Sequence, residues 1–566
     1  MRLFPDDTAQ AFLDEGWWSG LTWSDLLERN RAATPDRVTL VDAPNRPALT
    51  YGEPRRLTWA EVDAEVDALA AVLLAHGVRR DDVVGIQLPN VVELPLVFLA
   101  LTRIGAVVSP FPVQYGRHEL TGMGAAAGLT AYVTVERAVG RELAAGALEV
   151  QAELDSLHTV FVLGSDVAGT VRLDGGAGDP AALAAHRATW TPHANDCATL
   201  VWTSGTEGVP KGVPRAYGDW EVLSVAVSEV AQVVTEDVFL SPFPMTNGGG
   251  ISGTFIPWLL HSTVLVLHHP FDLEVFLTQV EQESITYTCA PPAILDALVV
   301  DDSAFERHDL SSLRAVSSGS APLSGWMIAR WERDHGVQVL NFFGSNEGTC
   351  LFGDPDSMPD PELRGRFFPR YGLADFPYRA GLHRGTRTRL VDLADGTEVT
   401  EPGRAGELRL TGPSVFSGYW GRERTDGFDE DGWYRTGDVF EIPAEQPHCY
   451  VLVDRAKDLI IRGGYNISAV ELEGLVMGDP GVAEVAAVAL PDDRLGERVC
   501  LFVVPRDPAS PPDLEHLVGR LRERGVARFK WPERLEVVDE LPRNPIGKVL
   551  KRDLRDRLAA LPQEVS

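Results

Sequence analysis

The chain has few cysteines, and none of them lies in a CxxC pair. Five occur among its 566 residues, at Cys197, Cys289, Cys350, Cys449 and Cys500. Their wide separation argues against a disulfide framework and against a cysteine zinc site. A reducing compartment is predicted.

Long apolar segments are also missing. The most apolar run, "LPLVFLALTRIGAVV" (94–108), is interrupted by Arg103, and the start, "MRLFPDDTAQ", has no basic segment followed by an apolar core. Neither pattern is typical of a membrane span or a secretory signal. The sequence therefore predicts a cytoplasmic protein without a membrane partner.

Positive charge is scarce as well. Lys and Arg number 51 against 82 Asp and Glu, which gives a formal net charge of −31. A surface of this sign repels nucleic acid, so no nucleic-acid partner is expected. An anionic ligand would need a local basic pocket.

Apolar periodicity predicts an α/β fold. "TWAEVDAEVDALAAVLLAHG" (58–77) begins with a Thr58/Glu61 capping box and predicts a helix that ends at Gly77. A strand (82–88), a second helix (91–106) and another strand (107–111) follow, and similar apolar runs recur at 262–267, 285–295 and 313–323. This alternation indicates parallel sheets, whose strand ends are the usual place for ligands.

The residue pattern changes toward the C-terminus. The segment 390–410 contains "DG" and "PG" turns and predicts β-hairpins, and a compact αβ stretch follows "DRAKDLIIRGGYNIS" (454–468). We therefore predict two domains, 1–453 and 454–566.

"TSGTEGVPKG" (203–212) follows a predicted strand (198–203) and precedes a helix-like segment (219–234). A glycine-rich turn there would aim backbone N–H groups at an anion, with hydroxyls from Ser204 and Thr206 and the charge of Lys211. Polyphosphate suits such a loop, although the spacing is not that of a Walker A motif. Taken alone, a plain Gly/Pro connector remains an alternative.

Two carboxylates follow strand-like segments. Glu347 in "FFGSNEG" (342–348) suits Mg²⁺, which needs few protein ligands when phosphates supply the rest. Asp438 in "YRTGD" (434–438) could accept hydrogen bonds from two sugar hydroxyls. Each could instead be solvated or cap a turn.

A lysine near the C-terminus completes the set. In "PRNPIGKVLKRDL" (542–554), Gly547 permits a tight turn that would present Lys548 to two approaching anions. The alternative is a lysine that only faces water.

Together these motifs resemble the adenylate-forming superfamily of acyl-CoA synthetases, peptide-synthetase adenylation domains and luciferases. Five matches carry the resemblance: "TSGTEGVPKG", "FFGSNEG", "YRTGD", "DRAKDLIIRGGYNIS" and "PRNPIGK". "DEGWWSGLTWSDLLERN", "GVPRAY" and "GVARFKWPERLEVVDELP" are similar to the stand-alone aryl acid:AMP ligases.

The resemblance implies a large N-terminal domain of stacked parallel-sheet subdomains plus a β-rich subdomain, with a small mobile α+β C-terminal domain. It implies ATP and Mg²⁺ as cofactors and CoA or phosphopantetheine as acyl acceptor. The implied nucleotide contacts are Thr203, Ser204, Gly205, Thr206, Gly208 and Lys211 for phosphate, Gly319, Ser320 and Ala321 for adenine, and Asp438 and Arg455 for ribose, with Phe343 as a further nucleotide contact. Glu347 would hold the metal, Lys457 would be the hinge, and Lys548 would be catalytic, with Glu347 and Lys211.

The sequence departs from the family pattern in its acid pocket, which the resemblance builds from Asn247, Gly248, Gly253, Phe342 and Gly344. Asn247 stands in place of a common histidine, and the two glycines stand where dihydroxybenzoate ligases have Asn and Ser. An acid bulkier or less polar than dihydroxybenzoate is expected, such as a phenyl, arylacrylic or alicyclic carboxylate. Alternatively, the glycines serve only the backbone.

Two further departures are Glu207, in place of Thr or Ser, and Asn346, in place of Thr, Ser or Ala. Glu207 is associated with CoA-forming members, whereas the aryl-ligase resemblance favours a carrier protein. The predicted activity is acid adenylation followed by transfer to a thiol, in a monomer or homodimer. The alternatives are transfer to an amine, activation of nitrite, and a non-catalytic nucleotide- or acyl-binding relative.

Overall fold

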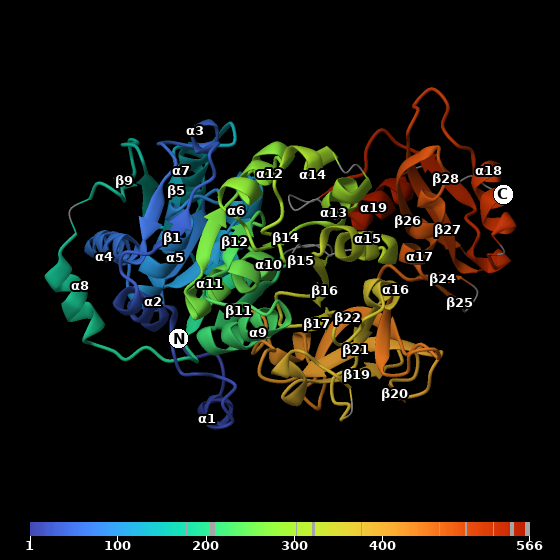
Figure 1. Ribbon diagram of the computed structural model, residues 1–566, viewed down its shortest axis with the longest axis horizontal. Helices are drawn as coiled ribbons and strands as arrows, with labels where there is room; N and C mark the ends of the chain where they lie inside the picture. The colour runs from blue at the N-terminus through green and yellow to red at the C-terminus, as the bar shows by residue number, and fades with distance from the viewer. Residues whose placement is uncertain are drawn as a thin grey trace. The chain divides into compact units, whose positions relative to one another are not determined.

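The computed structural model describes residues 1–176, 178–203, 210–300, 303–319, 323–374, 376–462, 465–492, 495–524, 526–543 and 548–560. The chain divides into two compact units, labelled by element in Figure 1. The first contains Met1–Thr203, Lys211–Thr388 and Leu410–Tyr434, and the second includes Arg389–Arg409 and Arg435–Ser566. The division into domains at residue 453 remains a prediction.

The first unit contains two large sheets with parallel interiors. One has the order β17-β16-β15-β14-β12-β13-β1-β2 and the other the order β11-β10-β4-β3-β5-β8-β9, with antiparallel pairs only at β17, β2 and β11. The strands of the first sheet are β1 (Val38–Val41), β2 (Arg56–Thr58), β12 (Val238–Ser241), β13 (Val264–Leu267), β14 (Tyr287–Cys289), β15 (Ala315–Gly319), β16 (Gln338–Gly344) and β17 (Cys350–Gly353). Those of the second are β3 (Val83–Gln87), β4 (Val107–Pro110), β5 (Ala131–Val135), β8 (Thr159–Leu163), β9 (Val171–Arg172), β10 (Cys197–Trp202) and β11 (Gly212–Ala216). The predicted parallel α/β class is confirmed.

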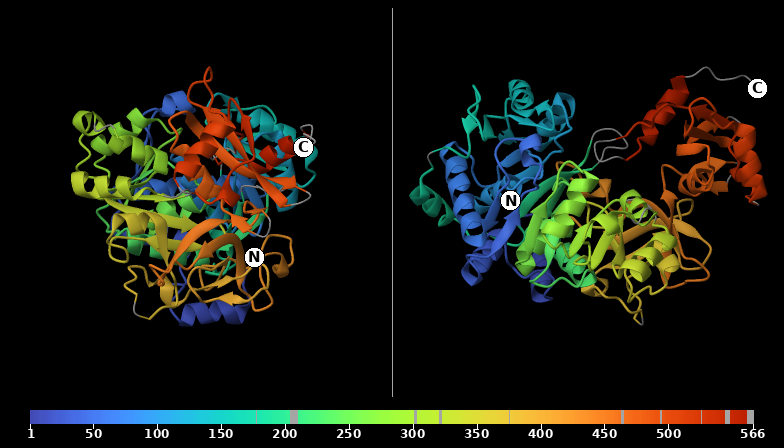
Figure 2. Two further views of the ribbon diagram at one scale, coloured as in Figure 1. Left: turned by 90° about the vertical axis from the view of Figure 1, so that its right-hand side faces the viewer. Right: turned by 45° about the horizontal axis from the view of Figure 1, so that its top comes forward.

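Helices pack against these sheets, and Figure 2 shows the blue to cyan helices beside their strands from two further directions. The longer ones are α2 (Trp23–Ala33), α4 (Trp59–Ala75), α5 (Glu93–Arg103), α6 (Arg117–Ala127), α7 (Leu143–Glu153), α8 (Pro180–Arg187), α9 (Tyr217–Val230), α12 (Leu273–Gln282), α13 (Pro292–Val300) and α15 (Gly325–His335). The predicted helix at 58–77 is confirmed as α4, with the Thr58/Glu61 capping box formed and Gly77 at φ +96° beyond its end. Buried side chains of α12, α13 and α15 form one core with β1, β12 and β13.

Two predicted segments divide differently in the structure. The apolar run 285–295 becomes the short strand β14 and the first turn of α13, which begins at Pro292. Proline is favoured in the first turn of a helix because its missing N–H would have no partner there. The "TSGTEGVPKG" segment does not lead directly into a helix, because the buried strand β11 intervenes before α9.

The second unit contains a hairpin region and a C-terminal αβ region. The strands β20 (Glu398–Val399), β19 (Arg387–Val391), β21 (Ala405–Thr411), β22 (Tyr434–Glu441) and β23 (Cys449–Arg455) are neighbours in that order. The antiparallel pair β19–β20 confirms the hairpin predicted at "DG". The hairpin predicted at "PG" is wrong, because β19 lies between β20 and β21 in the sheet. The C-terminal sheet contains β24 (Ile460–Arg462), β25 (Tyr465–Ile467), β26 (Val482–Asp492), β27 (Gly496–Pro505) and β28 (Arg534–Val537), together with α17 (Ala469–Met477), α18 (Leu514–Glu523) and α19 (Lys551–Ala560). Within the described residues, no helix is long and apolar enough to span a membrane.

Candidate active site

Thr203 and Lys211 lie side by side at the base of the predicted phosphate loop. The Thr203 N–H donates to the Lys211 carbonyl at 3.0 Å, and the Lys211 N–H donates to Thr203 Oγ1 at 3.0 Å. The flanking strands β10 and β11 are antiparallel, so the loop joins two strands rather than a strand and a helix. A helix dipole therefore does not follow the loop directly, and an anion there would depend on loop N–H groups and Lys211. Ser204, Gly205, Thr206, Glu207 and Gly208 lie outside the described residues.

The Lys211 side chain lies over an aromatic ring that sequence analysis did not single out. Its Nζ is 4.5 Å from the centroid of the Tyr419 ring and 3.9 Å from Asp426 Oδ1. The Tyr419 hydroxyl donates to Glu347 Oε1 at 3.0 Å. Burial and the Glu347 carboxylate raise the pKa of Tyr419 well above its usual range, so the hydroxyl keeps the proton that it donates. Tyr419 thus joins the loop lysine to the predicted metal ligand.

Glu347 lies in the turn between β16 and β17 and is only 7% exposed. Its carbonyl accepts from the Phe416 N–H at 3.0 Å, and Gly348, at φ +104°, brings the turn so close to Ser414 that a Cβ would lie 2.0 Å from the Ser414 carbonyl. Among the described residues, no cluster of three or more His, Cys, Asp or Glu could hold a metal alone. One buried carboxylate fits Mg²⁺ that takes its other ligands from phosphate and water.

Arg215 fixes the backbone around Glu347. Its guanidinium is fully buried and pairs with Asp219 Oδ1 at 2.9 Å, while Nη1 donates to the Asn346 carbonyl at 2.5 Å and Nη2 to the Ser414 carbonyl at 3.0 Å. Burial raises the pKa of Asp219 to about 6, and Arg215 opposes this shift. The two hydrogen bonds to carbonyls therefore tie β11 to the backbone around Glu347, while the ion pair with Asp219 holds the guanidinium in place.

Asn346 bridges the phosphate-loop strand and the predicted acid pocket. Its Nδ2 donates to the Trp202 carbonyl at 3.1 Å, and its Oδ1 accepts from the Gly248 N–H at 2.9 Å. A smaller Ser or Ala at this position could not make both contacts. The departure at Asn346 thus has a structural consequence, namely a fixed position of Gly248 relative to the end of β10.

Asn247 is the N-cap of the short helix α10 (Gly248–Gly250), because its side chain accepts from the Gly250 N–H at 3.4 Å. Gly253 lies in the following π-helical turn η1 (Ile251–Phe255), a feature often found at functional sites.

The backbone does not require glycine at positions 248 and 253, since neither has a positive φ. A Cβ at Gly253 would meet nothing within 4 Å, whereas one at Gly248 would lie 3.7 Å from Asn346 Oδ1. The interpretation that these glycines serve only the backbone is therefore disfavoured.

The remaining predicted residues of this unit lie on β15 and β16. Gly319 ends β15, and a Cβ there would lie 2.2 Å from the Phe342 carbonyl, so close strand packing requires glycine. Phe342, Phe343 and Gly344 end β16, with Phe342 packed edge-on against Phe352 at 4.8 Å. Ser320 and Ala321 lie outside the described residues.

Asp438, Arg455, Lys457 and Lys548 all belong to the second unit. Asp438 on β22 is opposite Arg455 on β23, and Arg455 Nε lies 3.1 Å from Asp438 Oδ1. The surrounding protein lowers the pKa of Lys548 to about 8, mainly by excluding water and next through Arg455, while Asp438 opposes the shift. Lys457 occupies the turn between β23 and β24. The sequence therefore identified a cluster of charged residues that the fold brings together within this unit.

Comparisons with known proteins agree with this geometry. Residues 27–420 match the family "AMP-binding enzyme", and residues 471–548 match "AMP-binding enzyme C-terminal domain". The chain is 31% identical to the 2,3-dihydroxybenzoate-AMP ligase of Bacillus subtilis, over 98% of this chain and 97% of that protein. It is 32% identical to a salicylyl-CoA synthase / salicylate adenylyltransferase of a Streptomyces species, over 98% and 96%.

The structure of the amide bond synthetase McbA from Marinactinospora thermotolerans superposes with a TM-score of 0.76 at 25% identity, covering 95% of this chain and 100% of that one. Because the first family match covers well over half of the chain, the chain belongs to the AMP-binding enzymes, the adenylate-forming superfamily that its sequence resembles.

Proposed function

We propose that the protein uses ATP to convert a carboxylic acid to an acyl adenylate, with release of pyrophosphate, and then transfers the acyl group to a thiol. The observation that carries this proposal is the contact of Tyr419 with both Lys211 and Glu347. It supports one site in which a cation and a metal-binding carboxylate handle the same polyphosphate. Lys548, beside Asp438 and Arg455, supplies a second cation within its own unit.

In the first step, an oxygen of the acid would attack the α-phosphorus of ATP. A new P–O bond forms, the bond from the α-phosphorus to the bridging oxygen breaks, and its electron pair leaves with pyrophosphate. Lys211 would bind the phosphates, and Lys548 would neutralise the approaching carboxylate and α-phosphate. Mg²⁺ held by Glu347 would supply further neutralisation of the triphosphate.

In the second step, a thiolate would attack the acyl carbonyl. The C–S bond forms, the C–O bond to AMP breaks, and AMP leaves with the electron pair. The acceptor would be CoA or the phosphopantetheine of a carrier protein, and rotation about Lys457 would separate the two steps. We place this reaction in the cytoplasm, in a monomer or homodimer.

We propose a phenyl, arylacrylic or alicyclic acid as substrate. A Cβ at Gly253 would meet nothing, which supports room for a larger acid, and the Phe342 ring offers an apolar partner. With glycine at 248 and 253, neither position offers a side-chain group to recognise hydroxyls of dihydroxybenzoate.

Acyl transfer to an amine is a second candidate for the final step. The similarity to an amide bond synthetase at a TM-score of 0.76 favours it. An amine would attack the same carbonyl, forming a C–N bond as AMP leaves.

Acid-dependent exchange of labelled pyrophosphate into ATP tests the first step over a panel of acids. Lys548→Ala is expected to abolish exchange, whereas Lys530→Ala, which removes a lysine paired with Glu471 in the same unit, should leave it intact. Exchange with no acid, or full exchange by Lys548→Ala, would overturn the proposal. Products formed with CoA, a pantetheinylated carrier or an amine then identify the acceptor.

A further inference from the structure

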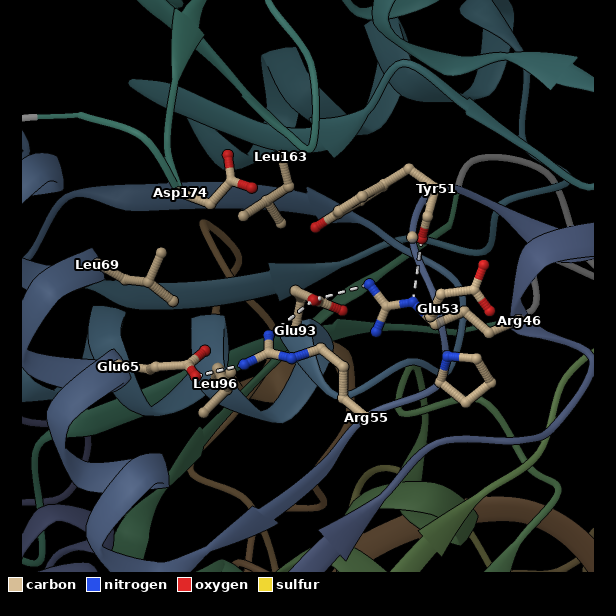
Figure 3. A pocket seen from close by; sticks show the side chains of 12 residues that line it. Arg46, Tyr51, Glu53, Arg55, Glu65, Leu69, Glu93, Leu96, Leu163 and Asp174 are labelled. Carbon is tan, nitrogen blue, oxygen red and sulfur yellow. Dashed lines mark hydrogen bonds and ion pairs between the residues drawn. The ribbon is translucent and has the colours of Figure 1, made fainter.

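A second pocket lies in the first unit and shares no residue with the candidate active site. It has a volume of about 340 Å³ and is lined by residues of the segment between α3 (Arg46–Leu49) and β2, of α4 and α5, and of the chain at and beyond the end of β8. Figure 3 shows the side chains of Arg46 and Arg55 directed toward Glu93.

One oxygen of Glu93 has no hydrogen-bond partner in the part of the chain that the structure describes. Glu93 is only 4% exposed, and its Oε1 accepts from Arg46 Nη2 at 2.9 Å and from Arg55 Nη1 at 3.2 Å. Its Oε2 is buried and has no hydrogen-bond partner among the residues that the structure describes. An unpaired buried carboxylate oxygen is costly, so a donor from a ligand or water is expected there.

The two arginines are already engaged by the protein. Arg46 also bonds to Asp42 and, through Nε, to the Tyr51 carbonyl at 3.0 Å, and Arg55 also pairs with Glu65. Their charges are therefore compensated, and an anionic ligand would find little to bind.

The Tyr51 hydroxyl is a second oxygen that lacks a partner among the described residues. Its hydroxyl is buried and lacks a hydrogen-bond partner within the described part of the chain. Burial, and next the carboxylates of Glu93 and Asp174, raise the pKa of Tyr51 well above its usual range, so the phenol stays neutral and can accept a hydrogen bond.

The charged and apolar side chains that line the pocket indicate which kind of ligand it could bind. The lining contains more carboxylates than guanidinium groups, since four acidic residues face two arginines: Glu53, Glu65, Glu93 and Asp174 against Arg46 and Arg55. Leucine side chains complete the wall, among them Leu69 and Leu163.

We propose that this pocket binds a short aliphatic amine as its ammonium ion. The ammonium donates to Glu93 Oε2 and the Tyr51 hydroxyl, and the alkyl chain packs against the leucines. An ammonium has three donors and no acceptor, so two of its donors can bond to the two oxygens that lack a partner among the described residues.

Calorimetric and thermal titrations with 1,4-diaminobutane test the proposal, with 1,4-butanediol as the neutral isostere and butanoate as the anion. A ligand that binds only the folded state raises Tm as its concentration exceeds Kd. We expect saturable binding of the diamine, at least about 10-fold tighter than the diol because its bonds are charge-assisted, and none of butanoate. No saturable binding, or equal binding of the diol, would overturn the proposal.

Asp174→Asn and Asp166→Asn form a matched pair of variants. Both carboxylates pair with Arg172, at 3.2 and 3.4 Å, but only Asp174 lines the pocket. Asp174→Asn should weaken diamine binding about 2- to 5-fold, and Asp166→Asn should not change it. Tyr51→Phe loses no hydrogen bond to a described residue, so it should fold normally and bind the diamine more weakly. Unchanged affinity in both Asp174→Asn and Tyr51→Phe would contradict the assignment.

Discussion

Tyr419→Phe would remove one hydroxyl and leave the aromatic ring in place. The hydroxyl donates to Glu347 Oε1 at 3.0 Å, whereas the ring lies 4.5 Å from Lys211 Nζ. The substitution therefore tests the link to Glu347, the proposed metal ligand, separately from the contact with the loop lysine.

The expected loss of activity follows from the free energy that the hydrogen bond between Tyr419 and Glu347 contributes. A bond to a charged group contributes about 1.5–3 kcal/mol, and Glu347 is 7% exposed, so water cannot fully replace the donor. If Tyr419 positions Glu347 in the transition state, kcat/KM for adenylate formation should fall about 10- to 150-fold. The Mg²⁺ concentration needed for half-maximal activity should rise, because a misplaced carboxylate holds the metal less well.

Acid-dependent pyrophosphate exchange, measured across a Mg²⁺ titration, provides the assay. Tyr419→Leu should lose about 2- to 5-fold more than Tyr419→Phe, since it also removes the cation–π contact. Tyr132→Phe is the control in the same unit, because it removes a buried hydrogen bond to Gln87 Oε1 at 3.2 Å that lies outside the candidate site.

Exchange at the normal rate and with the normal Mg²⁺ dependence in Tyr419→Phe would refute this role. An equal loss of activity in Tyr132→Phe would refute it too, since the effect would then reflect general destabilisation.

Three further predictions concern Lys548, Gly253 and Asn346. The pKa of Lys548 is lowered to about 8, and the proposed role needs its protonated form, so kcat/KM for ATP should be constant well below pH 8 and fall as the pH rises through that value. Lys548→Arg should keep its activity at higher pH, and a flat profile in the wild-type protein up to pH 10 would contradict this role. Gly253→Ser adds a hydroxyl in open space, so kcat/KM for hydroxybenzoates relative to kcat/KM for bulky acids should rise about 10-fold. If this ratio did not change, Gly253 would not line the acid pocket. Asn346→Ala loses the hydrogen bonds to the Trp202 carbonyl and the Gly248 N–H, so binding of the acid should weaken by about 1–3 kcal/mol and its KM should rise accordingly, while KM for ATP changes less. Equal rises in both KM values would contradict a role of Asn346 in placing the acid pocket.

Local sequence signals predicted much of the fold because the relevant interactions are short in range. The Thr58/Glu61 capping box formed as expected, since both partners lie within one helical turn. The fully buried strands β3 and β4 begin with Val-Val pairs and are mainly apolar, as is typical of strands covered on both faces. The strand β11 was missed, because "GVPRA" contains Pro214 and a charged residue, Arg215, whose burial is compensated by Asp219 and distant carbonyls.

The motifs likewise predict site roles for Thr203, Lys211, Glu347 and Lys548, because each combines a charged or hydroxyl group with turn-forming neighbours. Tyr419 carries no such signal. It lies 208 positions from Lys211 and 72 from Glu347 (419 − 211 and 419 − 347), so only folding brings the three together.

By itself, the sequence determined the alternation of strands and helices, the family and the identity of the charged groups, since these depend on neighbouring residues. Only the tertiary structure decided that Tyr419 joins Lys211 to Glu347, that Asn346 holds Gly248, and that a buried Glu93 oxygen has no partner in the described chain. Such properties depend on which distant groups meet and which remain unpaired, and chain packing fixes both.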